Sequence, residues 1–247
     1  MNIMIITGAS RGIGAATARL AVARGYAVCL NYRAQADAAH QLARELTDSG
    51  GRVITVQADV SIEADVLRMF ETVDRELGRV TALINNAGML ESQMPVASMS
   101  AERIARVLNI NVIGPFLCAR EAVKRMSTRR GGQGGSIVNV SSMAARLGSP
   151  NEYVDYAAAK GAIDTFTVGL AKEVGAEGIR VNAVRPGLIY TDMHASGGEP
   201  GRIERLKDSV PLKRGGQPEE VANAILWLAS DEASYTTGTF IDVSGGR

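Results

Sequence analysis

A tyrosine and a lysine four residues apart, Tyr156 and Lys160, are the residues of this chain best suited to moving a proton. In a helix this spacing puts both side chains on one face, and the three alanines between them favour helix and leave that face open. A free tyrosine titrates near pH ~10, and a cation beside it favours the phenolate and lowers the pKa. The pair is therefore predicted to act in acid-base chemistry, although the same spacing is common on solvated helices and is weak evidence alone.

The elements that must position this pair follow the pattern of one α/β domain. Short apolar runs alternate with longer amphipathic ones over the whole of 1–247, as in repeated β-α units around a parallel sheet. We predict a single Rossmann-like, doubly wound domain with about seven strands, and about six helices distributed over both faces of the sheet. An irregular glycine- and proline-containing segment at about 187–216 is predicted to be a substrate lid. The predicted strands are Ile3 to Thr7, Ala27 to Asn31, Val53 to Ala58, Ala82 to Asn85, Ser136 to Val140, Arg180 to Val184 and Thr239 to Val243.

Composition narrows the class of protein. Lys and Arg total 27 against 26 Asp and Glu, a balance that calls for neither nucleic acid nor an anionic membrane. Two cysteines, Cys29 and Cys118, stand in apolar stretches and indicate free thiols in a reducing compartment. The first apolar run is too short for a signal or membrane-spanning segment, so we expect a cytoplasmic protein. Two histidines and two distant cysteines offer no metal-ligand spacing, and no metal is required.

The first strand runs into a glycine loop, Thr7 to Gly14, that opens a helix. Bare backbone amides and the positive end of a helix dipole would there meet a pyrophosphate. The spacing is not the G-x-G-x-x-G fingerprint, and three glycines could also serve tight packing alone. The second strand ends without an acid, and Arg33 with Arg11 could hold the 2'-phosphate of NADP, with NAD less favoured. The alternative is two solvated arginines, and Asp37 is placed in the next helix, facing away.

Several further short motifs follow the glycine loop along the chain: Asp59-Val60, Asn85 to Gly88, Asn111, Ser142, the pair Tyr156 and Lys160, and Arg185 to Gly187 with Ile189 and Thr191. In their order and spacing, these motifs resemble those of the short-chain dehydrogenase/reductase family along essentially the whole chain. Its members include bacterial glucose 1-dehydrogenases, which the stretch from Pro218 to Gly238 resembles, and 3-oxoacyl reductases. The resemblance implies a catalytic set of Asn111, Ser142, Tyr156 and Lys160. The cofactor-binding residues, implied by the motifs together with the loop and strand ends above, are Gly8, Ser10, Arg11, Gly12, Ile13, Gly14, Tyr32, Arg33, Asp59, Val60, Asn86, Ala87, Gly88, Tyr156, Lys160, Pro186, Gly187, Ile189 and Thr191.

The mechanism implied by the resemblance is hydride transfer between a nicotinamide and a carbonyl or secondary alcohol. Tyr156 would exchange the proton, Lys160 would lower its pKa and bind ribose hydroxyls, and Ser142 would bond the reacting oxygen. Asn111 would hold a water that links Lys160 to solvent. Ser141 and Tyr153 are interpreted as unreactive neighbours, since Tyr153 has no cation four residues on. The family also implies a homotetramer whose long helices, containing Asn111 and Tyr156, pair across subunits.

The substrate is less well defined by the sequence. We expect a small polar molecule such as a sugar, with specificity residues among Gln93, Met143, Glu152, Tyr190 and 193–202. His194 lies in that segment and could contact the substrate, although a surface histidine is the simpler interpretation. Two alternatives stay open. One is a 3-oxoacyl thioester reductase, with Arg129 and Arg130 meeting an acidic acyl carrier protein or merely solvated. The other is a dinucleotide-binding regulatory protein without turnover.

Overall fold

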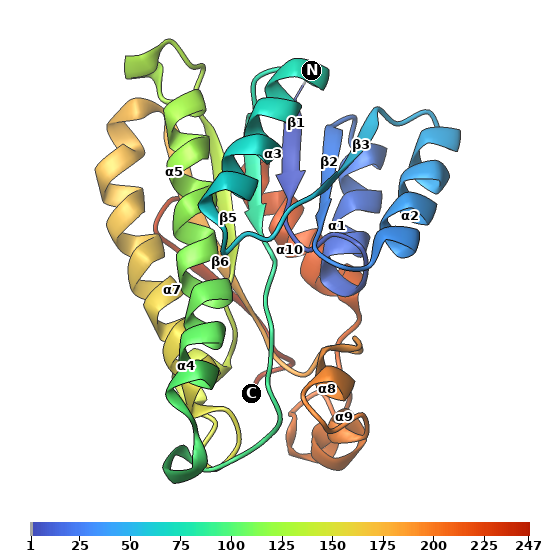
Figure 1. Ribbon diagram of the computed structural model, residues 1–247, viewed down its shortest axis with the longest axis vertical. Helices are drawn as coiled ribbons and strands as arrows, with labels where there is room; N and C mark the ends of the chain where they lie inside the picture. Colours follow the sequence, from blue (N-terminus) through green and yellow to red (C-terminus); the bar gives the residue numbers. More distant parts are fainter. Residues whose placement is uncertain (1) are drawn as a thin grey trace.

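The computed structural model describes residues 2–247 and is built around one parallel sheet (Figure 1). Its seven strands lie in the order β3-β2-β1-β4-β5-β6-β7. The chain adds β2 and β3 on one side of β1 and then β4 to β7 on the other side, so the strand order reverses between β1 and β4. Ligands of such sheets bind beyond the carboxyl ends of the strands at this switch point. The predicted fold is confirmed, and each strand ends within two residues of its predicted bounds. The strands are β1 Ile3–Ile6, β2 Ala27–Tyr32, β3 Val53–Gln57, β4 Ala82–Asn85, β5 Gly135–Val140, β6 Ile179–Pro186 and β7 Phe240–Val243.

The strands bury both faces, and alternate side chains enter two separate cores. In β1, Ile3 and Ile5 pack into one core while Met4 and Ile6 pack into the other. This is the period of two expected of a sheet covered by helices on both sides. One face is covered by α1 (Gly12–Ala23), α2 (Ala36–Asp48) and α10 (Pro218–Ala229), and the other by α3 (Glu63–Glu76), α5 (Gly114–Met126) and α7 (Val154–Val174) (Figure 1).

The helix that carries Asn111 contains a π-helical turn. The helical run begins with α4 (Ala101–Leu108), widens over Asn109–Ile113, and continues as α5. Such turns are rare and often lie at functional sites. The sequence pattern predicted helix here but not the widened turn. Three short helices, α6 (Ala144–Leu147), α8 (Met193–Ser196) and α9 (Arg202–Leu206), complete the α-helices of the described residues.

The segment at 187–216 leaves the sheet after β6 and returns close to where it left. Its two ends are joined by a bridge between Ile189 and Gly216, and the Gly216 amide donates to the Leu188 carbonyl at 2.8 Å. Leu188, Ile203 and Val210 form a small core of their own inside it. We call 187–216 the lid segment; it carries α8 and α9 beyond the carboxyl ends of the strands (Figure 1).

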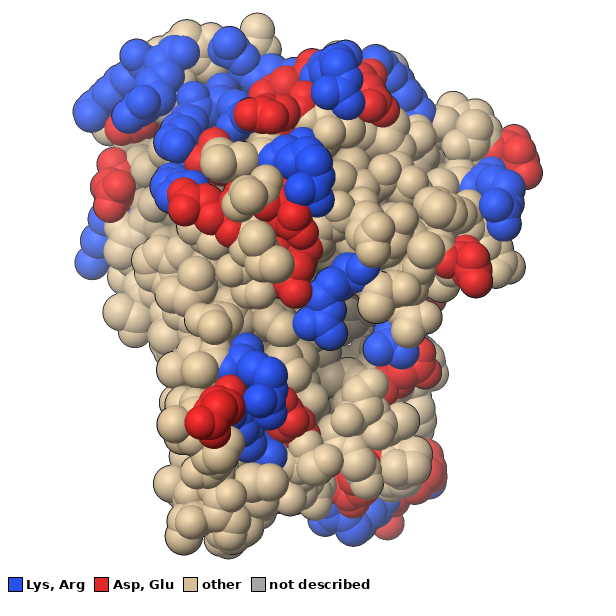
Figure 2. Space-filling model, in the orientation of Figure 1, with Lys and Arg blue, Asp and Glu red and all other residues tan. Residues whose placement is uncertain are grey.

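The charged surface is mixed in sign. On the face shown in Figure 2, Lys and Arg side chains gather at the top, over the ends of α3 and α5, with Asp and Glu among them. Arg129 and Arg130 lie in the turn after α5, just before β5 begins at Gly135, and therefore at the amino end of that strand. Within 2–247, the model has no helix with the length and apolar character that a membrane crossing requires.

Candidate active site

Two adjoining cavities lie at the carboxyl edge of the sheet. The first, here the glycine-loop cavity, has a volume of about 380 Å³ and lies between the ends of β1, β2 and β3. The second, here the lid cavity, has a volume of about 430 Å³ and lies between β5, α7 and the lid segment. Both are lined by a shared set of residues, so they form one continuous site: Ile13, Asn86, Gly88, Leu90, Thr191 and Met193.

The glycine loop is shaped by two glycines that no other residue could replace without strain. Gly8 has a φ of +62°, and a Cβ there would lie 2.9 Å from the Cα of Ala87. Gly14 lies on α1, and a Cβ there would lie 2.5 Å from the Gly8 carbonyl oxygen. The loop can therefore pack tightly under the start of α1, whose first amides have no partner within the helix and favour an anion.

Two asparagines tie the glycine loop to the neighbouring strand ends. The Asn31 side chain accepts from the Gly8 amide at 3.2 Å and donates to the Ala58 carbonyl at 3.0 Å. The Asn86 side chain donates to the carbonyls of Thr7 and Gly8 at 2.8 and 3.0 Å. The ends of β1 to β4 are thus connected by two asparagine side chains, of which Asn31 is buried. Sequence reasoning missed Asn31, whose only signal is a polar residue in an otherwise apolar strand.

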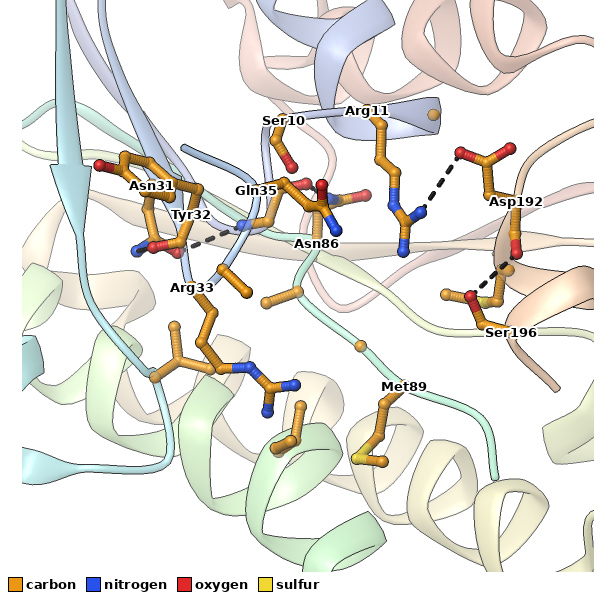
Figure 3. Close-up of a pocket in the computed structure, with 18 of the residues that line it drawn as sticks. Ser10, Arg11, Asn31, Tyr32, Arg33, Gln35, Asn86, Met89, Asp192 and Ser196 are labelled. Carbon is orange, nitrogen blue, oxygen red and sulfur yellow. Dashed lines mark hydrogen bonds and ion pairs between the residues drawn. The ribbon is translucent and has the colours of Figure 1, made fainter. Parts of the chain in front are cut away.

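Two arginines extend into the glycine-loop cavity (Figure 3). Arg11 lies 3.4 Å from Asp192 of the lid segment, and Arg33 lies 3.7 Å from Asp59. Both guanidinium groups are at least half exposed, and ion pairs of this kind contribute little. A phosphate could therefore replace either carboxylate. Asp37 is exposed on α2, as predicted.

Most of the predicted cofactor residues line one of the two cavities. Gly14 is the exception among the described residues, since it packs α1 against the loop. Gln35 also lines the glycine-loop cavity and was missed, because nothing in the sequence distinguishes it from other polar residues after β2. Those that line the glycine-loop cavity are Gly8, Ser10, Arg11, Gly12, Ile13, Tyr32, Arg33, Asp59, Val60, Asn86, Ala87, Gly88 and Thr191, and those that line the lid cavity include Tyr156, Lys160, Pro186, Gly187 and Ile189.

Tyr156 and Lys160 lie together on α7 and line the lid cavity with Ser142. The Lys160 Nζ atom lies 5.5 Å from the centroid of the Tyr156 ring and donates to the Val140 carbonyl at 2.8 Å. The Ser142 Oγ atom accepts from the Ala144 amide at 3.1 Å. The predicted pair is therefore brought to one wall, beside a hydroxyl contributed by the end of β5.

The predicted direction of the tyrosine pKa is wrong. Burial raises the pKa of Tyr156 to about 12, and a hydrogen bond with Ser142 offsets this only in part. Burial also lowers the pKa of Lys160 to about 8, against the opposing charge of Asp164. Both residues are under a tenth exposed, so desolvation disfavours the charged form of each and outweighs their attraction.

Asn111 is fully buried in the π-helical turn and bonds to backbone. Its side chain donates to the carbonyls of Val107 and Met89 and accepts from the Met89 amide, at 2.9 to 3.2 Å. A Cβ on the neighbouring Gly88 would lie 3.0 Å from the Asn111 Oδ1 atom and 3.7 Å from Lys160 Nζ. Asn111 therefore holds the backbone at Gly88 and Met89, which passes between Asn111 and Lys160.

The two hydroxyls interpreted as unreactive are engaged elsewhere. Ser141 donates to Asp164 at 2.6 Å, and Asp164 in turn accepts from Arg185 at 2.9 Å. Tyr153 donates to the Gly197 carbonyl at 3.1 Å and so contacts the lid segment. Both hydroxyls therefore make structural contacts.

Ion pairs connect the lid segment to the rest of the domain. Arg202, largely buried, pairs with Glu152 of the loop before α7 and with Glu199 at 3.1 Å. Hydrogen bonds from Arg205, Gln93 and Arg202 lower the pKa of Glu199 to about 2. Met143 and Glu152 line the lid cavity as expected, whereas Gln93 bonds to Glu199. Tyr190 donates to Glu204 at the outer side of the segment.

His194 is a second correction. It was expected at the surface, but it is only partly exposed and lines the lid cavity. Its Nδ1 atom is buried and has no hydrogen-bond partner among residues 2–247. Position 194 falls within the candidate specificity range 193–202, but its burial could not be predicted, because the position of α8 depends on the long-range ion pairs of the lid segment.

Comparison with known proteins identifies the family. A family model described as enoyl-(acyl carrier protein) reductase matches residues 8–247. The chain belongs to the short-chain dehydrogenase/reductase family. It is similar to the uncharacterized oxidoreductase YgfF of Escherichia coli (strain K12), at 59% identity over 247 residues that cover 100% of both chains. It is also similar to a 3-oxoacyl-[acyl-carrier-protein] reductase of Synechocystis, at 38% identity, covering 99% of this chain and 96% of the other.

A solved structure supports the same assignment. The short-chain type dehydrogenase/reductase from Mycobacterium marinum matches with a TM-score of 0.93 and 32% identity, over 99% of this chain and 94% of the other. Agreement at this level covers the sheet and its helices together. The protein is accordingly an oxidoreductase of this family.

Proposed function

We propose that the protein is an NADP-dependent oxidoreductase that transfers a hydride between the nicotinamide and the carbonyl or secondary alcohol of a small polar molecule. The observation that carries this proposal is the meeting of Ser142, Tyr156 and Lys160 in a cavity continuous with the glycine-loop cavity. A reacting oxygen placed between two hydroxyls and beside a cation is the arrangement that carbonyl reduction needs.

The residues present fit a dinucleotide. The amides at the start of α1 would hold its diphosphate, Asp59 and Val60 its adenine, and Arg11 with Arg33 its 2'-phosphate. Lys160 would bond the nicotinamide ribose, while the residues at the end of β6 and the start of the lid segment would contact the nicotinamide. When bound, the cofactor supplies or accepts the hydride.

The raised pKa of Tyr156 favours the reductive direction at neutral pH. A phenol that titrates near 12 is protonated at pH 7 and can donate its proton to a carbonyl oxygen held by Ser142. Lys160 is a cation below about pH 8, and it would stabilise the phenolate that forms. Oxidation of an alcohol needs the phenolate first, so it should be favoured at higher pH.

A thioester substrate is the second candidate, supported by the relative that is a 3-oxoacyl-[acyl-carrier-protein] reductase. The residues proposed for carrier docking do not support it. Arg129 and Arg130 precede β5, whereas Ser142 follows its carboxyl end, so they lie at the opposite edge of the sheet. A regulatory role without turnover is disfavoured, because Ser142, Tyr156 and Lys160 line one cavity.

A homotetramer is part of the proposal. Ile104, Leu108, Ile113 and Phe116 are each more than a third exposed and recur at helical spacing along α4 and α5. Phe116 stacks on Phe166 of α7 at 3.8 Å between ring centroids, which extends this apolar stripe onto the second long helix. Light scattering of the purified protein would test this, with a monomer as the contrary result.

A substrate panel tests the proposed reaction. Keto esters, ketoses, cyclic ketones and 3-oxoacyl thioesters are each mixed with the protein and NADPH or NADH, and nicotinamide absorbance is followed. We expect carbonyl-dependent oxidation of NADPH, faster than that of NADH. Absence of carbonyl-dependent oxidation of either cofactor across the panel would reject the proposed function.

A further inference from the structure

One wall of the lid cavity carries an imidazole whose hydrogen bonding is incomplete. The buried Nδ1 atom of His194 has no partner within the described residues. Buried polar groups in folded proteins are nearly always paired, so an orphaned one in a cavity wall points to a ligand. A half-turn of the ring about Cβ–Cγ exchanges Nδ1 with the carbon at the other ring edge, so either edge can be presented to the cavity.

The charge of Arg202 beside this imidazole is already paired. Arg202 lies between Glu152 and Glu199, and its side chain is only 9% exposed. A substrate carboxylate entering here would compete with two carboxylates that are in place. Burial, and then the positive charge of Arg202, lower the pKa of His194 below its ordinary value, against a smaller opposite effect of Glu199. A neutral imidazole offers one donor and one acceptor, which matches a hydroxyl.

Part of the lining of the lid cavity is apolar. Side chains from four segments contribute to it: Leu90, Met143, Leu147, Pro150 and Met193. Such a cavity accepts a carbon skeleton with a polar group at each end. We propose that the substrate is a ketone, or the corresponding alcohol, with a second, uncharged hydroxyl across an apolar ring or short chain, and that His194 binds this hydroxyl. The inference rests on the proposed function and adds the substrate class.

Three ketones with one ring test it: cyclohexanone, 4-hydroxycyclohexanone and 4-oxocyclohexanecarboxylate. The carboxylate is included because Arg247 also lines the lid cavity and could bind an anion. We expect wild-type kcat/KM to be highest for the hydroxyketone. His194→Leu should lower that value about tenfold, mainly through KM, and change the value for cyclohexanone less than about twofold. His194→Asn keeps a donor and an acceptor and should retain most of the preference.

Each other outcome rejects the inference in a distinct way. An equal loss for all three ketones in His194→Leu would assign the histidine a structural role. Highest wild-type kcat/KM for the carboxylate would assign the wall to an anion. The protein could also reduce another carbonyl compound of the substrate panel but none of these three ketones. That result would exclude this substrate class and leave the proposed function standing. No turnover of any carbonyl would reject both.

Discussion

The two halves of the site are built from different kinds of contact. In the glycine-loop cavity, the side chains of Asn31 and Asn86 bond to backbone groups at the ends of neighbouring strands. In the lid cavity, side-chain bonds join residues far apart in sequence, such as Arg202 and Glu152, 50 positions apart, or Gln93 and Glu199, 106 apart. Contacts to the backbone therefore shape the glycine-loop cavity, whereas contacts between side chains shape the lid cavity.

The largest difference between the halves should come from a single methyl group on the glycine loop. In Gly14→Ala the new Cβ would lie 2.5 Å from the Gly8 carbonyl oxygen and 2.7 Å from the Asn86 side-chain nitrogen. The loop must shift, and we expect the Kd for NADPH, measured by fluorescence titration, to rise about 100-fold.

The matched control is Gly169→Ala in α7. A Cβ there meets nothing within 4 Å, so the substitution should leave the Kd unchanged and stabilise the helix by about 0.5–1 kcal/mol. Equal cofactor affinity in the two variants would show that close packing at Gly14 does not shape the loop.

Charge reversal at the rim of the glycine-loop cavity should have the next largest effect. Arg33→Asp removes a guanidinium and places a carboxylate where the 2'-phosphate would bind, while the adenosine ribose hydroxyls gain an acceptor. We expect the ratio of kcat/KM for NADPH to that for NADH to fall about 30-fold. Arg44→Asp, at an exposed position on α2, makes the same change in charge and should leave the ratio within about twofold. An unchanged ratio in Arg33→Asp would refute the assigned phosphate site.

Breaking the ion pairs of the lid segment should weaken binding in the lid cavity and leave binding in the glycine-loop cavity unchanged. Arg202→Met removes the more buried of the two arginines that pair with both Glu152 and Glu199, and should loosen the lid segment. We expect KM for a ketone to rise about tenfold while the Kd for NADPH changes less than about twofold. Arg205→Met, at a half-exposed position, should raise KM only slightly. Equal losses of ketone and NADPH binding in Arg202→Met would show that the two halves are not separable.

A buried cation distinguishes the lid cavity in its dependence on pH. Burial lowers the pKa of Lys160 to about 8 from an ordinary value near ~10.5, so between these values the unfolded chain binds more protons and stability rises with pH. Lys160→Met should therefore be more stable than wild type at pH 7, and this difference should shrink by about 1–2 kcal/mol between pH 8 and 10. Denaturant unfolding measures it, with Lys172→Met, an exposed position on α7, as the control. A difference that is constant with pH would contradict the burial of the charge.

Sequence reasoning reached the fold and most of the site for a physical reason. Strand periodicity and the order of the motifs place Gly8, Ser142 and Tyr156 at one edge of a parallel sheet, wherever the helices lie in detail. Predictions from the sequence were wrong where a property of a side chain depends on how it is packed. Burial of Tyr156 reversed the expected pKa shift, and the surroundings of His194 depend on contacts made by residues far away in sequence.

The proton-donor role of Tyr156 is tested most directly by comparing Tyr156→Phe with Tyr153→Phe. Both substitutions remove a phenolic hydroxyl from the same wall, but the Tyr153 hydroxyl donates to the Gly197 carbonyl. With NADPH and a ketone that wild type reduces, we expect kcat of Tyr156→Phe to fall about 10²–10⁴-fold. The Kd for NADPH should stay within about threefold, and Tyr153→Phe should keep most of its turnover. Retention of more than about a tenth of wild-type kcat by Tyr156→Phe would contradict the assignment of Tyr156 as the proton donor.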